Sequence, residues 1–264
     1  MNPNERQKYQ TFCEETARAA GDILMDYVGK FHVYEKGRSD LVTEADFASQ
    51  TFVKERILQY FPDHLILGEE NIADTNALGG PGKFRWIVDP LDGTTNYVHG
   101  MPFFCVSLAL EADGELLVGA IYAPALGECY TAACGGGAFL NGKPIHVSST
   151  SRLEDSLAGF GFPADVQLES PDLQTFLSLL NVCHALRRMG SAALNLAYVA
   201  AGRFDVVWNF RTHPWDIAAG VLLVREAGGI VVDTKNASLV LDKGDFIAAA
   251  SEELKNQLTP FFPH

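Results

Sequence analysis

Asp89 and Asp92 stand at the end of an apolar run and are the residues of this chain best suited to metal chemistry. The run 86–88 (Trp-Ile-Val) leads straight into 89–96 (Asp-Pro-Leu-Asp-Gly-Thr-Thr-Asn), which predicts a buried strand ending at a turn. If the chain turns into a helix after Pro90, both carboxylates face one point, and their repulsion calls for a cation. Hard oxygen ligands favour Mg²⁺ over zinc.

The residues that follow suit a phosphate group. Gly93 and Thr94 offer unhindered backbone N–H groups at a predicted helix start, where the helix dipole favours an anion. A metal ion and a phosphate would therefore meet at one place. Asp-Pro and Asp-Gly pairs are also ordinary turn formers, so the same residues fit a turn without a catalytic role.

A second strand is predicted to end on acids. The run 65–67 (Leu-Ile-Leu) reaches Gly68, Glu69 and Glu70. Adjacent residues on a strand point to opposite sides, so only one of the two glutamates can join a given metal site.

Asp216 opens an apolar helix that is predicted to begin at Pro214 and to run through Val224. Proline suits the first helical position, and an acid in the first turn is favoured by the dipole. Beside Trp215 and without a basic neighbour, however, a buried Asp216 would be a costly unpaired charge. A metal ion would remove that cost.

Thr43 and Asp46 have the spacing of a helix cap with an acidic partner, at the start of a helix predicted to end before Pro62. Both residues can therefore be wholly structural. The polar loop 35–40 before them contains Lys36, and it is either a solvated connection or a mobile flap near an anionic substrate.

Composition limits the class of protein. With 264 residues, of which 47% are hydrophobic, the chain can form one large domain over 1–264, with halves of about 1–150 and 151–264. The net charge of −13 argues against nucleic acid or an anionic membrane as a partner. Five cysteines without a CxxC pair indicate reduced thiols and a cytoplasmic protein. Neither a signal peptide nor a membrane span is predicted.

The predicted elements change rhythm between the halves, which favours an α+β or α/β fold. The first half begins with two helices, over about 4–28 and 43–60, and continues as strands and an antiparallel meander over 65–67, 86–88, 104–111, 116–122, 128–133 and 145–147. The second half alternates strands with helices, the strands over 156–160, 185–189, 205–208, 230–232 and 246–248 and the helices over 173–182, 192–201, 214–224 and from 251.

Four motifs occur in order over nearly the whole chain: 68–70 (Gly-Glu-Glu), 89–96, 190–192 (Gly-Ser-Ala) and 215–216 (Trp-Asp), the last followed by 226–229 (Glu-Ala-Gly-Gly). Together they resemble the signature motifs of the inositol monophosphatase family. The resemblance implies a layered α-β-α-β-α sandwich, usually a homodimer, that hydrolyses a small phosphorylated substrate with two or three Mg²⁺ ions. It also implies inhibition by Li⁺ and no covalent phosphoenzyme.

The resemblance also assigns the metal ligands. It implies that Glu69, Asp89 and the backbone carbonyl of Leu91 hold one metal, and that Asp89, Asp92 and Asp216 hold a second. Such ions polarise the phosphoryl oxygens and lower the pKa of a bound water.

The same resemblance makes Thr94 and Asp46 the pair that orients and deprotonates the attacking water, so that they form the catalytic set with Glu69. The backbone N–H groups of Gly93 and Thr94 would hold the phosphate, beside Asp92 and Asp216.

One departure from the family concerns the substrate. Inositol-specific members carry a Glu seven residues before the C-terminal metal Asp, whereas this chain has Asn209, which donates as well as accepts hydrogen bonds. Ser191 and Ala192 match positions that line the same pocket, and Lys36 roughly matches a flap lysine. The expected substrate is inositol monophosphate or a similar small polyol or sugar phosphate.

Other activities remain open at the level of the sequence. Asn209 is compatible with a fructose bisphosphatase, a histidinol phosphatase or a nucleotide 3′-phosphatase. A haloacid-dehalogenase-like phosphatase is disfavoured, because its two aspartates are two residues apart rather than three. A non-catalytic regulator with the same fold is disfavoured by the intact set of acids. No histidine is expected to be catalytic, and His213 is expected at a helix start.

Overall fold

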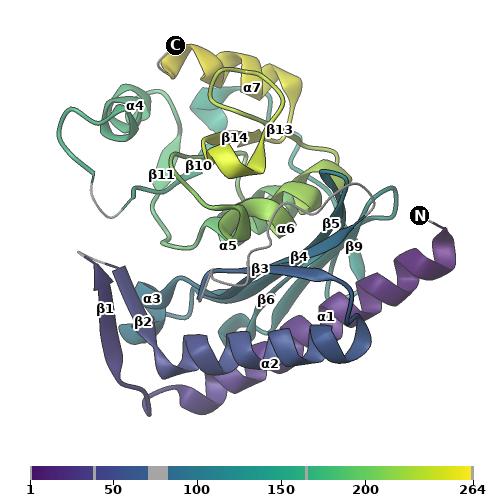
Figure 1. Cartoon of the computed structure of the whole chain (residues 1–264). Coiled ribbons are helices and arrows are strands. Elements are labelled where there is room, and N and C mark those ends of the chain that lie inside the picture. The colour runs from purple at the N-terminus through teal and green to yellow at the C-terminus, as the bar shows by residue number, and fades with distance from the viewer. Residues whose placement is uncertain (1, 38–39, 71–82, 164–165, 263–264) are drawn as a thin grey trace.

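A computed structural model describes residues 2–37, 40–70, 83–163 and 166–262. It is layered α-β-α-β-α (Figure 1), as the resemblance implies. The long helices α1 (Pro3–Tyr27) and α2 (Glu44–Tyr60) form the first layer. Helices α5 (Ala192–Ala200) and α6 (Pro214–Glu226) lie between the two sheets, and the outermost layer holds α4 (Pro171–Leu179) and α7 (Glu252–Leu258).

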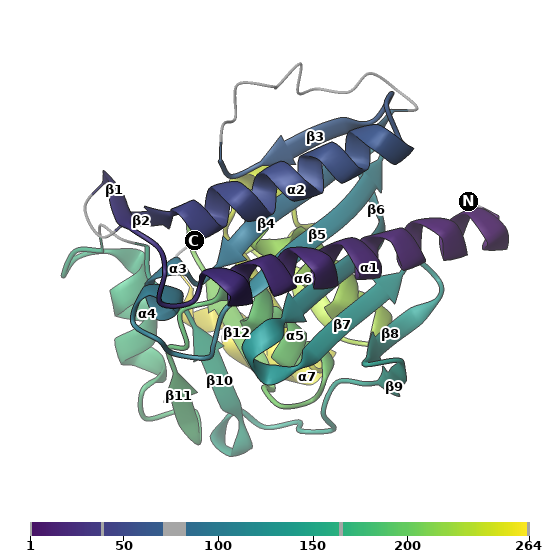
Figure 2. The same cartoon turned by 90° about the horizontal axis from the view of Figure 1, so that it is seen from below.

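The first sheet has seven strands in the order β3-β4-β5-β6-β7-β8-β9, and only the β3–β4 pair is parallel. Figure 2 shows α1 and α2 lying across one face of this sheet. The strands are β3 (Leu65–Gly68), β4 (Phe84–Asp92), β5 (Cys105–Ala112), β6 (Glu115–Ala123), β7 (Glu128–Ala133), β8 (Gly137–Leu140) and β9 (Lys143–Ile145).

The side chains of β4 alternate between two cores. Trp86 and Val88 pack in the core shared with α1 and α2, whereas Ile87 packs in the core shared with α5 and α6. A strand buried on both faces reads as a continuous apolar run, which is the pattern that predicts it from the sequence.

The second sheet has five strands in the order β11-β10-β12-β14-β13, where β10 is parallel to both neighbours and β14 is antiparallel to both of its own. Its outer face packs on α4 and α7 through a third core. The strands are β10 (Leu157–Phe160), β11 (Ala185–Arg187), β12 (Val206–Asn209), β13 (Ile230–Val232) and β14 (Phe246–Ala249).

Several boundaries differ from the sequence prediction. A small hairpin, β1 (Val33–Gly37) and β2 (Asp40–Thr43), occupies the segment predicted as a polar loop, and the short strand β8 was not predicted. Helix α4 ends three residues before the predicted limit of 182. Strand β9 ends at Ile145 rather than 147.

None of the helices in the described part of the chain is long and apolar enough to cross a membrane. The five cysteines all lie in the described ranges and all are free, and only Cys134 is exposed.

Candidate active site

The sequence predicts that the strand ends before Pro90. In the structure, strand β4 continues to Asp92. The register with β5 shifts between Asp89, which pairs with Ser107, and Asp92, which pairs with Cys105. Residues three apart on a regular strand would point to opposite faces, and a bulge of this kind re-aims side chains. The irregularity in β4, rather than a helix after Pro90, brings the two aspartates together.

Glu69, Asp89, Asp92 and Asp216 are called the group of acids below. Each of its three aspartates accepts a hydrogen bond from a protein donor. Asp89 is buried, and its Oδ1 accepts from the Leu91 N–H over 3.0 Å. Asp92 Oδ2 accepts from the Ser191 hydroxyl over 2.6 Å and from the Ala193 N–H over 2.7 Å, so the first turn of α5 contacts this carboxylate.

Asp216 lies in the first turn of α6 and accepts from the His213 N–H over 2.7 Å. This bond is half of a capping box, with His213 as the N-cap residue, so the prediction that His213 starts a helix is confirmed. Its ring stacks on Trp215 at a centroid distance of 4.6 Å. Asp216 is half-buried rather than fully buried.

The two neighbouring glutamates separate as expected. The Glu69 N–H donates to the Val88 carbonyl over 3.3 Å, which extends the pairing of β3 with β4 by one residue. The Glu69 charge acts on Asp89 and Asp216, whereas the buried Glu70 lines a separate cavity. Glu69 is therefore the glutamate that belongs to the group of acids.

The electrostatics of the group show carboxylates that repel one another. Burial, followed by the charges of Glu69, Asp92 and Asp216, raises the pKa of Asp89 well above its ordinary value. Burial and then Asp92 raise the pKa of Asp216 in the same way. Burial raises the pKa of Asp92 to about 6, although its hydrogen bonds oppose the shift. A cation would relieve this repulsion.

The chemistry of these donors fits Mg²⁺, which prefers carboxylate and carbonyl oxygens. In the described ranges, however, no three or more His, Cys, Asp or Glu side chains are grouped so that they could hold a metal ion. In this structure Asp92 and Asp216 each direct one carboxylate oxygen to a protein N–H or hydroxyl. The donor types fit a metal, and the side chains would have to adjust to it.

Thr94 and Asp46 are in contact. The Thr94 hydroxyl lies 3.3 Å from Asp46 Oδ1 and 3.0 Å from the Leu91 carbonyl oxygen. Asp46 Oδ2 accepts from the N–H and hydroxyl of Thr43, at 2.8 and 2.7 Å, and so completes the predicted cap of α2. Asp46 thus has both a structural contact and a contact with Thr94. Burial raises its pKa to about 6.

Gly93 allows the chain to turn between Asp92 and helix α3 (Thr94–Val98). Its φ of 95° is in the left-handed region, and a Cβ there would lie 2.9 Å from the Phe103 carbonyl oxygen. Only glycine fits both conditions.

Asn96 belongs to the motif 89–96, but the sequence predicts no role for it. Its Nδ2 donates to the carbonyls of Phe103, over 2.7 Å, and Met189, over 2.8 Å. The bond to Met189 connects α3 to the segment that leads into Ser191. This hydrogen bond of Asn96 therefore connects the part of the site at α3 with the part at the start of α5.

The predicted substrate residues have different surroundings. Ser191 caps α5 and contacts Asp92, and the Ala192 N–H also supports that carboxylate. Asn209 ends β12 and, two residues after Val207, faces the layer of α5 and α6. Its Oδ1 is buried and has no hydrogen-bond partner among the residues that the structure describes. Lys36 belongs to β1, and its side chain lies outside the described residues.

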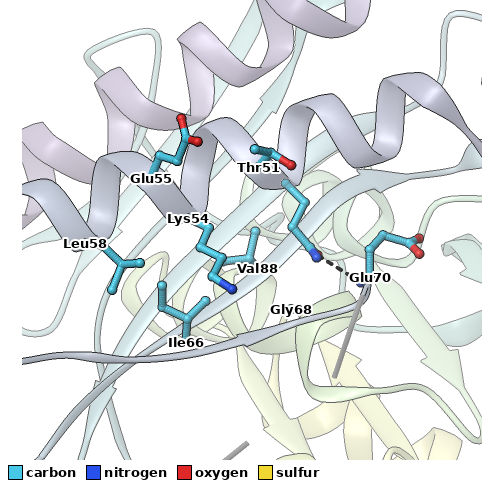
Figure 3. A pocket seen from close by; sticks show the side chains of 9 residues that line it. Thr51, Lys54, Glu55, Leu58, Ile66, Gly68, Glu70 and Val88 are labelled. Carbon is cyan, nitrogen blue, oxygen red and sulfur yellow. Dashed lines mark hydrogen bonds between the residues drawn. The ribbon is translucent and has the colours of Figure 1, made fainter. Parts of the chain in front are cut away.

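A cavity of about 330 Å³ lies between α2 and β3 (Figure 3). Glu70 and Gly68 form part of its wall, but none of Asp89, Asp92 and Asp216 does. The cavity is therefore next to the group of acids without containing it.

Known proteins resemble this chain over almost its full length. The model of the inositol monophosphatase family matches residues 5–262. A relative named Nus factor SuhB, from Pseudomonas aeruginosa, is 41% identical over 254 residues, which are 94% of this chain and 93% of the relative. The solved inositol monophosphatase from Anabaena (Nostoc) has a TM-score of 0.85 and 38% identity, and the match covers 97% of each chain. An IMPase/NADP phosphatase solved with Mg²⁺ and phosphate has a TM-score of 0.85 and 25% identity, over 97% of this chain and 95% of that one.

The fold and these relatives define a phosphoric monoester hydrolase from a metal-dependent group of enzymes. The chain belongs to the inositol monophosphatase family.

Proposed function

We propose that this protein is a Mg²⁺-dependent phosphatase that hydrolyses inositol monophosphate or a similar small polyol or sugar phosphate. The observation that carries the proposal is the contact of Thr94 with Asp46 directly beside Asp89 and Asp92, whose pKa values are raised. A hydroxyl paired with a carboxylate next to such acids is suited to activating water near a metal-bound phosphate.

The proposed metal ligands are Glu69, Asp89, the Leu91 carbonyl, Asp92 and Asp216. Bound Mg²⁺ would neutralise their charges, polarise the phosphoryl oxygens and lower the pKa of a water molecule. We propose that two or three ions bind. The four carboxylates carry enough charge to balance two of them. The hydrogen bonds from Ser191 and Ala193 orient Asp92 for this role, as partners of a metal ligand commonly do.

Thr94 and Asp46 would move the proton. Thr94 Oγ1 would take a proton from the attacking water as its own hydroxyl proton passes to Asp46 Oδ1, while Thr43 holds Asp46 Oδ2. With a pKa of about 6, Asp46 is ionised at neutral pH and is a stronger base than an ordinary aspartate, as a general base should be. Glu69 completes the proposed catalytic set.

The phosphate would bind at the backbone N–H groups of Gly93 and Thr94, at the start of α3, where Gly93 itself has no side chain. Asp92 and Asp216 would also contact the substrate. The rest of the substrate would lie against Ser191, Ala192, Asn209 and Lys36. The unpartnered Oδ1 of Asn209 supports this placement, because a buried acceptor without a donor is uncommon and a substrate hydroxyl would satisfy it.

Four further properties remain proposals for this chain. The family resemblance implies a homodimer and inhibition by Li⁺, the five cysteines indicate a cytoplasmic location, and nucleic acid is not expected among its partners. The net charge of −13 supports the last of them.

The experiment that tests the function is release of phosphate from inositol, sugar, histidinol and nucleotide phosphates, with and without Mg²⁺. Asp89→Asn should lower kcat/KM about 1000-fold or more, because several kcal/mol of transition-state stabilisation depend on the metal. Asp22→Asn, the same change at an exposed position of α1, is the control. No turnover of any phosphate by the folded protein would contradict the proposal.

A further inference from the structure

Helix α2 contacts two of the three chain segments that carry the proposed metal ligands, the ends of β3 and β4. Besides Asp46, one turn further along the same face, it presents Ser49 and Gln50 toward the ends of β3 and β4. Residues three and four apart lie on one side of a helix. The helix that carries Asp46, the proposed base, therefore also contacts the segments that hold Glu69 and Asp89.

Gln50 holds the segment that contains Glu69. Its Oε1 accepts from the Glu70 N–H over 2.9 Å, the bond drawn at Glu70 in Figure 3. The fit is close, since a Cβ on Gly68 would lie 2.7 Å from the same oxygen. Glu69 is thus fixed on both sides, by the bond of its own N–H to Val88 and by the bond of the next N–H to Gln50.

Ser49 holds the segment that contains Asp89 and Leu91. Its side chain is fully buried and donates to the Pro90 carbonyl over 2.9 Å. Pro90 lies within the register shift of β4, between the pairs that Asp89 and Asp92 form with β5. The hydrogen bond from Ser49 therefore stabilises the irregular part of the strand, where ladder pairing is interrupted.

We propose that Ser49 and Gln50 are positioning residues of the metal centre, which set the separation between Glu69 and the segment from Asp89 to Leu91. Because the two side chains are adjacent on one rigid helix, they keep both segments at a fixed distance. The inference rests on the proposed function, since it takes Glu69, Asp89 and Leu91 as ligands. Residues that orient metal ligands typically change metal affinity 10- to 100-fold when replaced.

The first test replaces Gln50 with leucine, which keeps the size of the side chain and removes the acceptor. We expect the Mg²⁺ concentration for half-maximal activity to rise about 10-fold or more, with kcat at saturating Mg²⁺ nearly unchanged. Mn²⁺ affinity, measured by calorimetry without substrate, should fall by the same factor. Gln50→Glu retains an acceptor and should restore affinity. Gln59→Leu, the same change at an exposed position of α2, should have no effect.

Two further variants test the positioning role of Ser49 and Gln50 without replacing Gln50. Gly68→Ala places a methyl group against the Gln50 amide and should weaken Mn²⁺ binding as Gln50→Leu does. Ser49→Ala removes the bond to Pro90 and should also weaken it.

Glu69→Gln separates the two proposals. If Glu69→Gln weakens metal binding but Gln50→Leu binds Mn²⁺ like the wild type, the positioning role is wrong and the ligand assignment stands. A lower melting temperature in Gln50→Leu with unchanged metal affinity would equally overturn the positioning role. If Glu69→Gln itself binds metal normally, the ligand assignment is wrong, and the positioning role falls with it.

Discussion

The Thr94 hydroxyl lies 3.3 Å from Asp46 Oδ1, although the two residues are 48 positions apart and belong to different helices. Thr94 begins the short helix α3 directly after the turn at Gly93, and Asp46 lies in the first turn of α2. The contact joins the start of one helix to the start of the other. It places a hydroxyl and a carboxylate beside the group of acids that ends β4.

Replacing Thr94 with valine should lower kcat about 100-fold or more, since general-base catalysis commonly contributes 10²- to 10⁴-fold. Valine keeps the shape of threonine and removes only the hydroxyl. Mn²⁺ affinity should stay close to that of the wild type, because the threonine side chain is not a proposed ligand. A kcat within a few-fold of wild type, measured at saturating Mg²⁺ and substrate, would show that the hydroxyl moves no proton.

Activity should depend on the ionisation of Asp46. Burial raises its pKa to about 6, and only the ionised form can accept a proton. We therefore expect kcat, measured at saturating Mg²⁺, to fall as the pH is lowered through about 6. The residual activity of Thr94→Val should lack this dependence, because its relay is already broken. A wild-type kcat that is constant between pH 7 and 5 would contradict the role of Asp46 as base.

The same shift predicts an effect on stability without metal. A carboxyl whose pKa is raised in the folded state contributes stability at low pH, and this contribution is lost as the pH rises through the folded-state pKa. Asp46→Asn should thus be more stable than the wild type by about 1–3 kcal/mol at pH 7.5, and the gain should disappear near pH 4. Urea unfolding at both pH values measures this. A variant that is less stable at pH 7.5 would mean that burial of the charge is not the dominant effect.

The local features of the sequence predicted much of the site. The cap formed by Thr43 and Asp46 depends only on neighbouring residues, and it is present as predicted. Glu69, whose charge acts on Asp89 and Asp216, and Glu70, which lines the cavity, have different surroundings, although both lie beyond the last residue of β3.

Features that depend on distant partners were not predictable in this way. Proline normally disfavours a strand interior, so the continuation of β4 through Pro90 depends on the bulge against β5 and on the bond from Ser49. The role of Asn96 depends on the carbonyl of Met189, which is 93 residues away. The sequence does indicate that Ser49 and Gln50 lie on the same face of the helix as Asp46, since they follow it by three and four residues.

Asn209→Glu should shift the substrate preference. Glutamate would restore the acid that inositol-specific members carry, and it accepts hydrogen bonds from hydroxyls without donating. We expect kcat/KM for inositol monophosphate to rise about 10-fold relative to the best alternative phosphate, a ratio of the size that one hydrogen-bonding group provides. Asn236→Glu, at a surface turn, is the matched control. An unchanged ratio would show that Asn209 does not contact the substrate.

We propose above that the acids at the ends of β3 and β4 and at the start of α6 bind the catalytic metal. The most direct measurement is a crystal structure with Mn²⁺, whose anomalous scattering locates the ion independently of any assumed ligand. We expect at least one anomalous peak in contact with Asp89, and no such peak in Asp89→Asn crystals. Peaks only elsewhere in an enzyme that Mn²⁺ activates would contradict it.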